Sequence, residues 1–153
     1  MAGMYLEDFH VGDVIRHAQT RTVTETDNVL FNSMTMNPQP LHLDAHFAAE
    51  SHYGERIVNA VFTLGLVVGI PVYETTLGTT LGHLSYEEIT FPAPVRHGDT
   101  LRVETEVLDS RESKSKPDRG IVKLEHRAFN HEGTLVCRVV RLALMARRSH
   151  AEA

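Results

Sequence analysis

The first third of the chain alternates between strand-like and helix-like patterns of apolar residues. Residues 14–15 and 20–23 predict a strand after a turn. Thr24 follows as the expected N-cap of a helix that runs to about Thr35, with acidic residues in its first turn. The stretch Asn37-Pro38-Gln39-Pro40 cannot continue this helix, because proline lacks an N–H and restricts the residue before it.

Two further helices are predicted in the middle of the chain. Asp44 is the expected N-cap of a short helix over residues 45–52, which Gly54 ends. A longer helix is predicted over residues 60–68. Its apolar residues cover nearly every face, so other parts of the protein should surround it.

The second half of the chain predicts four strands. The first spans residues 81–91, and a proline-rich turn separates it from residues 100–109, where apolar and polar residues alternate. Residues 121–130 and 134–146 predict a hairpin, and the polar segment 110–120 predicts a loop before it. One strand, then helices, then four strands indicate an α+β fold in which an antiparallel sheet wraps around the long central helix.

Composition narrows the class of protein. A length of 153 residues suggests one domain over residues 1–153, with residues 147–153 as a frayed tail. The net charge of -5 disfavours a nucleic-acid or membrane-surface partner. Cys137 is the only cysteine, which excludes an intrachain disulfide and fits a reducing compartment. No basic segment precedes an apolar stretch at the start, so a cytoplasmic protein is expected.

The sequence predicts neither a metal site nor a membrane span. His42 and His46 are four residues apart, but the helix expected to begin at Asp44 starts between them, so they should not share a helical face. The apolar run 58–72 is interrupted by polar residues, glycines and a proline. It also falls short of the roughly 20 residues that a transmembrane helix needs.

Four stretches of the chain resemble, in the same order, the MaoC-like (R)-specific enoyl-CoA hydratase/dehydratase family. They are residues 21–27, 37–44, 56–60 and 91–101. The resemblance covers most of the chain and implies a hot-dog fold and a homodimer with two sites at its interface. It also implies reversible hydration of a trans-2-enoyl thioester, with coenzyme A as part of the substrate and no separate cofactor.

The family's catalytic motif is altered in this chain. In words it is Gly-Asp-x-Asn-Pro-x-His-x-Asp, and its first Asp and its His form the catalytic pair. His42 matches the motif's His. Without a gap, Asn37 then stands at the Asp position and Gln39 at the Asn position, whereas the alternative register places Thr35 at the Asp position. In both registers the motif's acid is missing.

The remaining residue types still suit chemistry on a thioester. His42 is expected to move protons, because imidazole titrates near neutral pH. The side-chain amide of Asn37 cannot exchange protons, but it can orient a water molecule. We therefore predict His42 and Asn37 as the catalytic residues.

Substrate-binding residues are predicted beside this pair and at the start of the long helix. Gln39 carries an amide that can orient a carbonyl. The family's downstream His-Gly is replaced here by Asn59-Ala60. The resemblance implies that a backbone N–H at this helix start holds the thioester oxygen, and Ala60 retains that N–H. Val61 begins the run of side chains that sets the depth of the acyl pocket.

Three functions stay open at this point. A hydratase would act on a small, branched or carboxylated acyl thioester, and a substrate carboxylate would explain the lost acid because two carboxylates repel. A thioesterase would instead use Glu87 or Glu88, and a non-catalytic acyl-CoA-binding protein would need only the pocket. The cations considered for the coenzyme A phosphates are Arg56, Arg96, Lys114 and Lys116.

Overall fold

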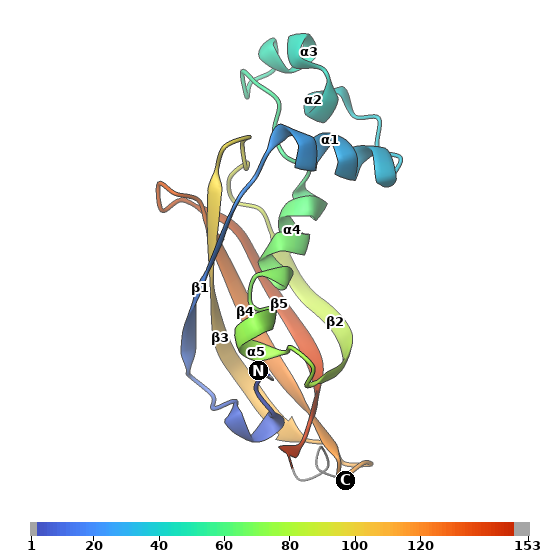
Figure 1. Ribbon diagram of the computed structural model, residues 1–153, viewed down its shortest axis with the longest axis vertical. Coiled ribbons are helices and arrows are strands. Elements are labelled where there is room, and N and C mark those ends of the chain that lie inside the picture. Colours follow the sequence, from blue (N-terminus) through green and yellow to red (C-terminus); the bar gives the residue numbers. More distant parts are fainter. Residues whose placement is uncertain (1–2, 149–153) are drawn as a thin grey trace.

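A five-stranded antiparallel sheet forms the body of the protein. The computed structural model describes residues 3–148. The strand order is β1-β3-β4-β5-β2, and the strands are β1 (Val14–Thr22), β2 (Thr80–Thr90), β3 (Thr100–Glu112), β4 (Arg119–Phe129) and β5 (Leu135–Ala146). The sheet curves around α4 (Ala60–Gly69), as Figure 1 shows. This confirms the predicted α+β hot-dog fold.

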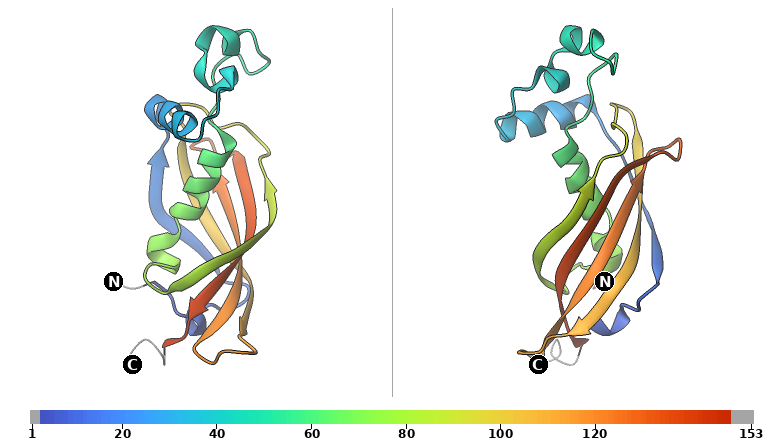
Figure 2. Two further views of the ribbon diagram at one scale, coloured as in Figure 1. Left: turned by 90° about the vertical axis from the view of Figure 1, so that its right-hand side faces the viewer. Right: turned by 180° about the vertical axis from the view of Figure 1, so that it is seen from behind.

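Three helices project beyond one end of the sheet. They are α1 (Glu25–Met34), α2 (Pro40–Leu43) and α3 (Ala45–Ala49), and both further views place them above the start of α4 (Figure 2). The 3₁₀-helix η1 (Leu6–Asp8) and α5 (Val72–Thr75) lie toward the other end. The predicted caps are confirmed: Thr24 accepts from Asp27 N, and Asp44 accepts from His46 N and Phe47 N.

The apolar core consists of two clusters. One packs Val67 and Ile70 against Leu101 and Val139, beside the end that carries α1–α3. The other packs the N-terminal Leu6 and Phe9 against strand residues such as Leu124 and Met145. Cys137 is buried in the first cluster, and burial raises the pKa of its thiol to about 11, so this thiol is not a nucleophile at neutral pH.

A row of polar side chains crosses the sheet between the two clusters. Arg141 Nε donates to His126 Nε2 at 2.8 Å, and His126 Nδ1 lies 2.7 Å from the Thr105 hydroxyl. That hydroxyl lies 2.7 Å from His17 Nε2, and His17 Nδ1 lies 2.6 Å from a Glu74 carboxylate oxygen. A guanidinium can only donate and a carboxylate can only accept. With one donor in each bond, every hydrogen bond of the row therefore runs in the same direction, from Arg141 to Glu74. Burial and the neighbouring Arg141 hold the pKa of His126 well below its ordinary value, which keeps this ring neutral.

The helices differ from the sequence prediction in which faces they bury. The inward residues of α1 are Asn28 and Asn32, while Leu30 is 54% exposed and Met34 is 76% exposed. The prediction that α4 is surrounded is wrong for the single chain, because Val61 is 60% exposed. The sheet covers only one side of this helix, and the other side leaves apolar surface open to solvent.

Smaller differences concern the ends of elements. Residues 40–43 form α2, a helix that was not predicted, and α3 ends at Ala49 instead of His52. Strand β3 continues to Glu112, which shortens the predicted loop. Of the predicted frayed tail, Arg147 and Arg148 pair with Glu7 and Asp8, and the remaining residues of the tail lie outside the described part of the chain.

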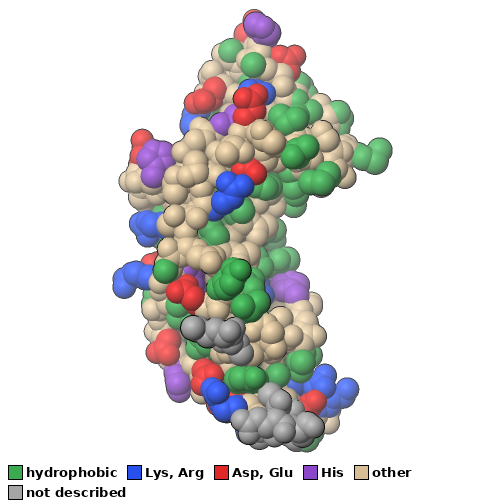
Figure 3. Space-filling view, viewed as in Figure 1, with side chains coloured by type: hydrophobic (Ala, Val, Ile, Leu, Met, Phe, Trp, Pro, Cys, Tyr) green, Lys and Arg blue, Asp and Glu red, His purple; other side chains and the backbone are tan. Residues whose placement is uncertain are grey.

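Exposed apolar side chains extend from α1 over α4 to the β2 edge of the sheet. Figure 3 shows hydrophobic side chains gathered over α1 and α4 on the face toward the viewer. The exposed apolar residues of α4, the α5 region and β2 are Val61, Tyr73, Leu77, Leu81, Leu84, Tyr86 and Ile89. Among residues 3–148, no helix combines the length and the apolar character needed to cross a bilayer.

Candidate functional site

The first backbone N–H of α4, that of Ala60, is free. Asn59 is the N-cap, and its side-chain oxygen accepts from Val61 N at 2.9 Å, so the Val61 N–H is occupied. No oxygen within residues 3–148 accepts a hydrogen bond from the Ala60 N–H. The helix dipole adds positive partial charge at this end. The Ala60 N–H is therefore suited to stabilise a developing oxyanion.

His42 is held in one tautomer by the backbone. It lies on α2, and its Nδ1 is 2.8 Å from the carbonyl oxygen of Ile57. A carbonyl can only accept, so Nδ1 carries the proton. In the neutral ring Nε2 is then unprotonated, which is the state that a general base requires.

A side-chain amide on α1 holds the segment that leads into α4. Asn28 is fully buried, and its Nδ2 lies 3.1 Å from the Ile57 carbonyl oxygen. Its Oδ1 accepts from Asn59 N at 2.9 Å, so one amide pairs with both the C=O of Ile57 and the N–H of Asn59. Asn28 Nδ2 also lies 3.0 Å from His97 Nε2. This amide pairs with the segment as the backbone of a neighbouring strand would.

A second buried amide extends the network. Asn32 Nδ2 donates to Asn28 Oδ1 at 3.0 Å and to the Asn28 carbonyl oxygen at 2.8 Å. Asn32 Oδ1 accepts from Asn59 Nδ2 at 2.8 Å. Together with the Val61 N–H, these bonds satisfy the polar atoms of the Asn59 side chain. Three amides from α1 and the start of α4 thus form one satisfied cluster.

The two predicted amides of the motif lie in the turn between α1 and α2. Asn37 Oδ1 accepts from Gln39 N at 3.0 Å, and Gln39 Oε1 accepts from Leu41 N at 3.5 Å to cap α2. Asn37 also lines a cavity of about 180 Å³ together with Phe31, Thr35, Asn59 and Val61. The structure therefore brings Asn37, Asn59 and Val61 together, whereas the Gln39 side chain is exposed and serves the helix cap.

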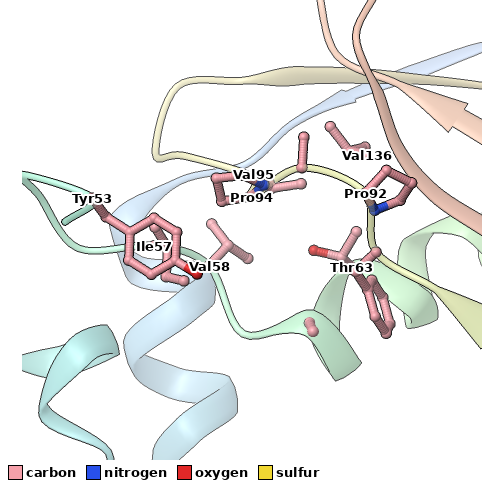
Figure 4. Close-up of a pocket in the computed structure, with 11 residues that line it drawn as sticks. Tyr53, Ile57, Val58, Thr63, Pro92, Pro94, Val95 and Val136 are labelled. Atoms are coloured by element: carbon pink, nitrogen blue, oxygen red, sulfur yellow. The ribbon is translucent and has the colours of Figure 1, made fainter.

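A larger cavity opens on another side of the α4 start. It has a volume of about 360 Å³ and lies between the segment before α4, the first turn of α4 and the segment that follows β2 (Figure 4). Its walls are largely apolar, and Ala60 and Thr63 belong to them. Ile57, whose carbonyl binds His42, lines it as well. This volume and apolar lining are typical of a small-ligand pocket.

The two carboxylates considered for a thioesterase form ion pairs on the sheet. Glu87 pairs with Lys123 at 2.5 Å, and Glu88 pairs with Arg138 at 2.6 Å. Neither glutamate lines the two cavities at α4. Neither of these two glutamates therefore belongs to the cavity that Ala60 lines, which the thioesterase interpretation would need.

Two of the four cations considered for coenzyme A lie near the site. Arg56 and Arg96 pair with Glu25 and Glu55 close to the segment that leads into α4. Lys114 and Lys116 belong to the β3–β4 loop, at the end of the sheet away from α1–α3 (Figure 1). A phosphate group bound near His42 would therefore meet the arginines and not these lysines.

Sequence reasoning missed Asn28, Asn32 and His97. Their only signal was the spacing of the two asparagines, four residues apart on one helix. No group of three or more His, Cys, Asp or Glu side chains in the described range 3–148 is arranged to hold a metal ion.

Comparison with known proteins identifies a matching domain family. Residues 8–128 match the MaoC like domain. The chain is 30% identical over 150 residues to the mesaconyl-CoA hydratase of Cereibacter sphaeroides, which covers 98% of this chain and 43% of that protein. It is 33% identical over 111 residues to the 3-hydroxybutyryl-CoA dehydratase of Methylorubrum extorquens, covering 69% of this chain and 65% of that protein.

A solved structure supports the same assignment. The crystal structure of the MaoC-like dehydratase from Rhodospirillum rubrum is 32% identical, with a TM-score of 0.82 over 95% of this chain and 99% of that one. This chain spans less than half the length of the mesaconyl-CoA hydratase that it matches. The match to the domain nevertheless covers most of the sequence, and the fold agrees with it. The chain therefore belongs to the MaoC-like domain family, and the relatives named above are hydratases and dehydratases.

Proposed function

We propose that this protein adds water reversibly to the double bond of a small 2-enoyl-CoA thioester, with (R) specificity. The observation that carries the proposal is that one short segment, residues 57–60, both binds His42 through the Ile57 carbonyl and carries the free Ala60 N–H at an apolar cavity of about 360 Å³. A base, an oxyanion donor and an acyl pocket are the three parts that this reaction needs.

The proposed reaction uses His42 for both proton transfers. His42 Nε2 takes a proton from a water molecule while the water oxygen bonds to C3 of the substrate. The electron pair of the double bond moves toward the thioester carbonyl, and the Ala60 N–H stabilises the resulting enolate oxygen. The proton then passes from His42 to C2. The net change is the addition of one water molecule, and dehydration follows the same path in reverse.

Asn37 takes the place of the motif's acid in this proposal. Its side chain lines the smaller cavity, and its amide can hold the attacking water, although it cannot accept a proton. An amide also avoids repulsion with a carboxylate on the acyl group. A branched or carboxylated short acyl group is therefore the proposed substrate, in line with the relative named mesaconyl-CoA hydratase.

A panel of thioesters tests the proposed function. Crotonyl-CoA and mesaconyl-CoA would be mixed with the protein, and loss of the enoyl-thioester absorbance would be followed. We expect turnover, with the carboxylated thioester preferred. Tight binding of both thioesters without turnover would establish the binding function instead, and release of free thiol would establish a thioesterase.

Asn37→Asp separates the role of the amide from that of an acid. The variant restores a second proton acceptor and adds a negative charge at the site. We expect it to raise kcat/KM for crotonyl-CoA about tenfold and to lower it for mesaconyl-CoA about tenfold, because like charges then meet only in the second case. Equal changes for the two substrates would contradict a site adapted to a carboxylated acyl group.

We also propose that two copies of the chain form a homodimer through β2 and the exposed side of α4. The β2 strand is an edge strand with exposed apolar side chains, and such an edge is covered in most stable proteins. A two-fold dimer would cover Val61 and the β2 edge of both copies at once. The proposed site of each copy would then lie next to the dimer interface.

Leu84→Lys tests this interface. Leu84 is 48% exposed on β2, and a lysine there would place a charge in the covered surface. We expect wild-type protein to sediment as a dimer at micromolar concentration and Leu84→Lys to weaken the dimer about 10- to 100-fold. Val11→Lys is the matched control, since Val11 is 62% exposed at the turn before β1. A monomeric wild-type protein would contradict the proposed dimer.

A further inference from the structure

One buried amide contacts both halves of the proposed catalytic site. Asn28 binds the carbonyl of Ile57, and that same carbonyl accepts from His42 Nδ1. Asn28 also binds the N–H of Asn59, the residue that precedes Ala60. The base and the oxyanion donor are therefore attached to one short segment, residues 57–60, and Asn28 holds that segment at two points.

The orientation of the Asn28 amide is fixed by its partners. The backbone N–H of Asn59 can only donate, so the atom that receives it must be the amide oxygen. The amide nitrogen then faces three acceptors: His97 Nε2 at 3.0 Å, the Ile57 carbonyl at 3.1 Å and the His42 backbone carbonyl at 3.3 Å. Neither an aspartate nor an aliphatic residue reproduces this set of one acceptor and two donors.

His97 completes the arrangement as an acceptor. Its Nε2 receives an N–H of Asn28, which requires a neutral ring with the proton on Nδ1. Burial and the positive charge of Arg56 lower the pKa of His97, and both effects favour this neutral ring. An acceptor at this point stops the Asn28 amide from rotating away from Ile57.

We infer that Asn28, supported by His97, is a positioning residue that fixes His42 in the Nδ1–H tautomer and orients the Ala60 N–H. The inference extends the proposed function, since it assigns residues that act on the base and the donor without touching the substrate. His42 remains the catalytic residue of the pair.

Asn32 supplies a matched control on the same helix. It is 1% exposed, lies one turn after Asn28, donates to it and accepts from the Asn59 side chain, but it makes no hydrogen bond to Ile57 or His97. Asn28→Ala and Asn32→Ala both remove a buried amide. A purely structural role predicts the same consequences for the two variants, whereas a positioning role predicts a difference.

The decisive measurement is the tautomer of His42 by ¹⁵N NMR of histidine-labelled protein. We expect the Nδ1–H form in wild type and in Asn32→Ala, and a mixture of tautomers in Asn28→Ala. With a substrate that is turned over, we expect kcat of Asn28→Ala to fall about 10- to 100-fold relative to Asn32→Ala, with little change in KM. The NMR result tests the inference even if no thioester in the panel reacts.

Two substitutions of His97 keep the inference testable if Asn28→Ala does not fold. Glutamine places an oxygen near the position of His97 Nε2, so His97→Gln should retain the Nδ1–H tautomer of His42 and most of the activity. His97→Leu removes the acceptor and should lose both. An unchanged His42 tautomer in both Asn28→Ala and His97→Leu, or equal effects of His97→Gln and His97→Leu, would overturn the inference.

Discussion

Replacing His42 by asparagine is expected to lower kcat by about 100- to 10,000-fold, the usual contribution of a general acid–base residue. The asparagine amide nitrogen lies where His42 Nδ1 lies, so the donor to the Ile57 carbonyl is retained. The base at Nε2 is lost. Steady-state kinetics on the best substrate of the panel would measure the change, and binding of the thioester should remain.

His46→Asn is the control for this substitution. His46 is exposed on α3, and unlike His42 it has no hydrogen bond to the Ile57 carbonyl. The same chemical change four residues away should leave kcat as it is. If His42→Asn retained wild-type turnover, another group would have to be the base.

Ala60→Pro is expected to lower kcat by about 100- to 1,000-fold without destabilising the fold, because it deletes the proposed oxyanion donor. Proline is favourable at the first position of a helix, where its missing N–H has no internal partner. Asn59 already has φ of -59° and ψ of 127°, a conformation that the residue before proline readily adopts. The variant therefore removes one N–H and keeps the helix.

Thermal unfolding and kinetics together decide this second prediction. Ala45→Pro makes the same change at the first position of α3, which Asp44 caps as Asn59 caps α4. Both variants should keep a melting temperature close to wild type, and only Ala60→Pro should lose activity. Full activity in a folded Ala60→Pro protein would show that the enolate oxygen is held elsewhere.

The sequence predicted the elements whose ends are marked by local chemistry. Thr24 and Asp44 cap helices as expected, and the central helix begins at Ala60. The short α2 was missed because four residues are too few to show a helical period, although Gln39 caps it and Pro40 suits its first position. Its presence matters, since it carries His42.

The pattern of apolar residues could not predict which face of α1 is buried. Apolar residues normally mark the buried side of a helix, yet Asn28 and Asn32 are buried here and Met34 is exposed. The two amides are inside because the backbone entering α4 needs hydrogen-bond partners that no apolar residue supplies. Such a requirement comes from a segment about thirty residues away, so a local pattern cannot show it.

The motif located His42 but not what holds it. Its partner is the carbonyl of Ile57, a backbone atom that every residue possesses, so the side-chain identity at position 57 carries no signal for it. The same is true of the Ala60 N–H. The sequence could therefore identify candidate side chains, but it could not show the backbone groups that hold them or act beside them.

The polar row from Arg141 to Glu74 divides the interior into two compartments. On β3, β4 and β5 the row residue stands between members of the two apolar clusters. The cavity of about 360 Å³ draws its walls from one compartment only, through residues such as Val58, Val95 and Val136. Substitutions in the other compartment, for example at Leu124, then affect stability without reshaping the cavity, since distant sites act independently. Substrate preference and stability can accordingly change separately in the evolution of this chain.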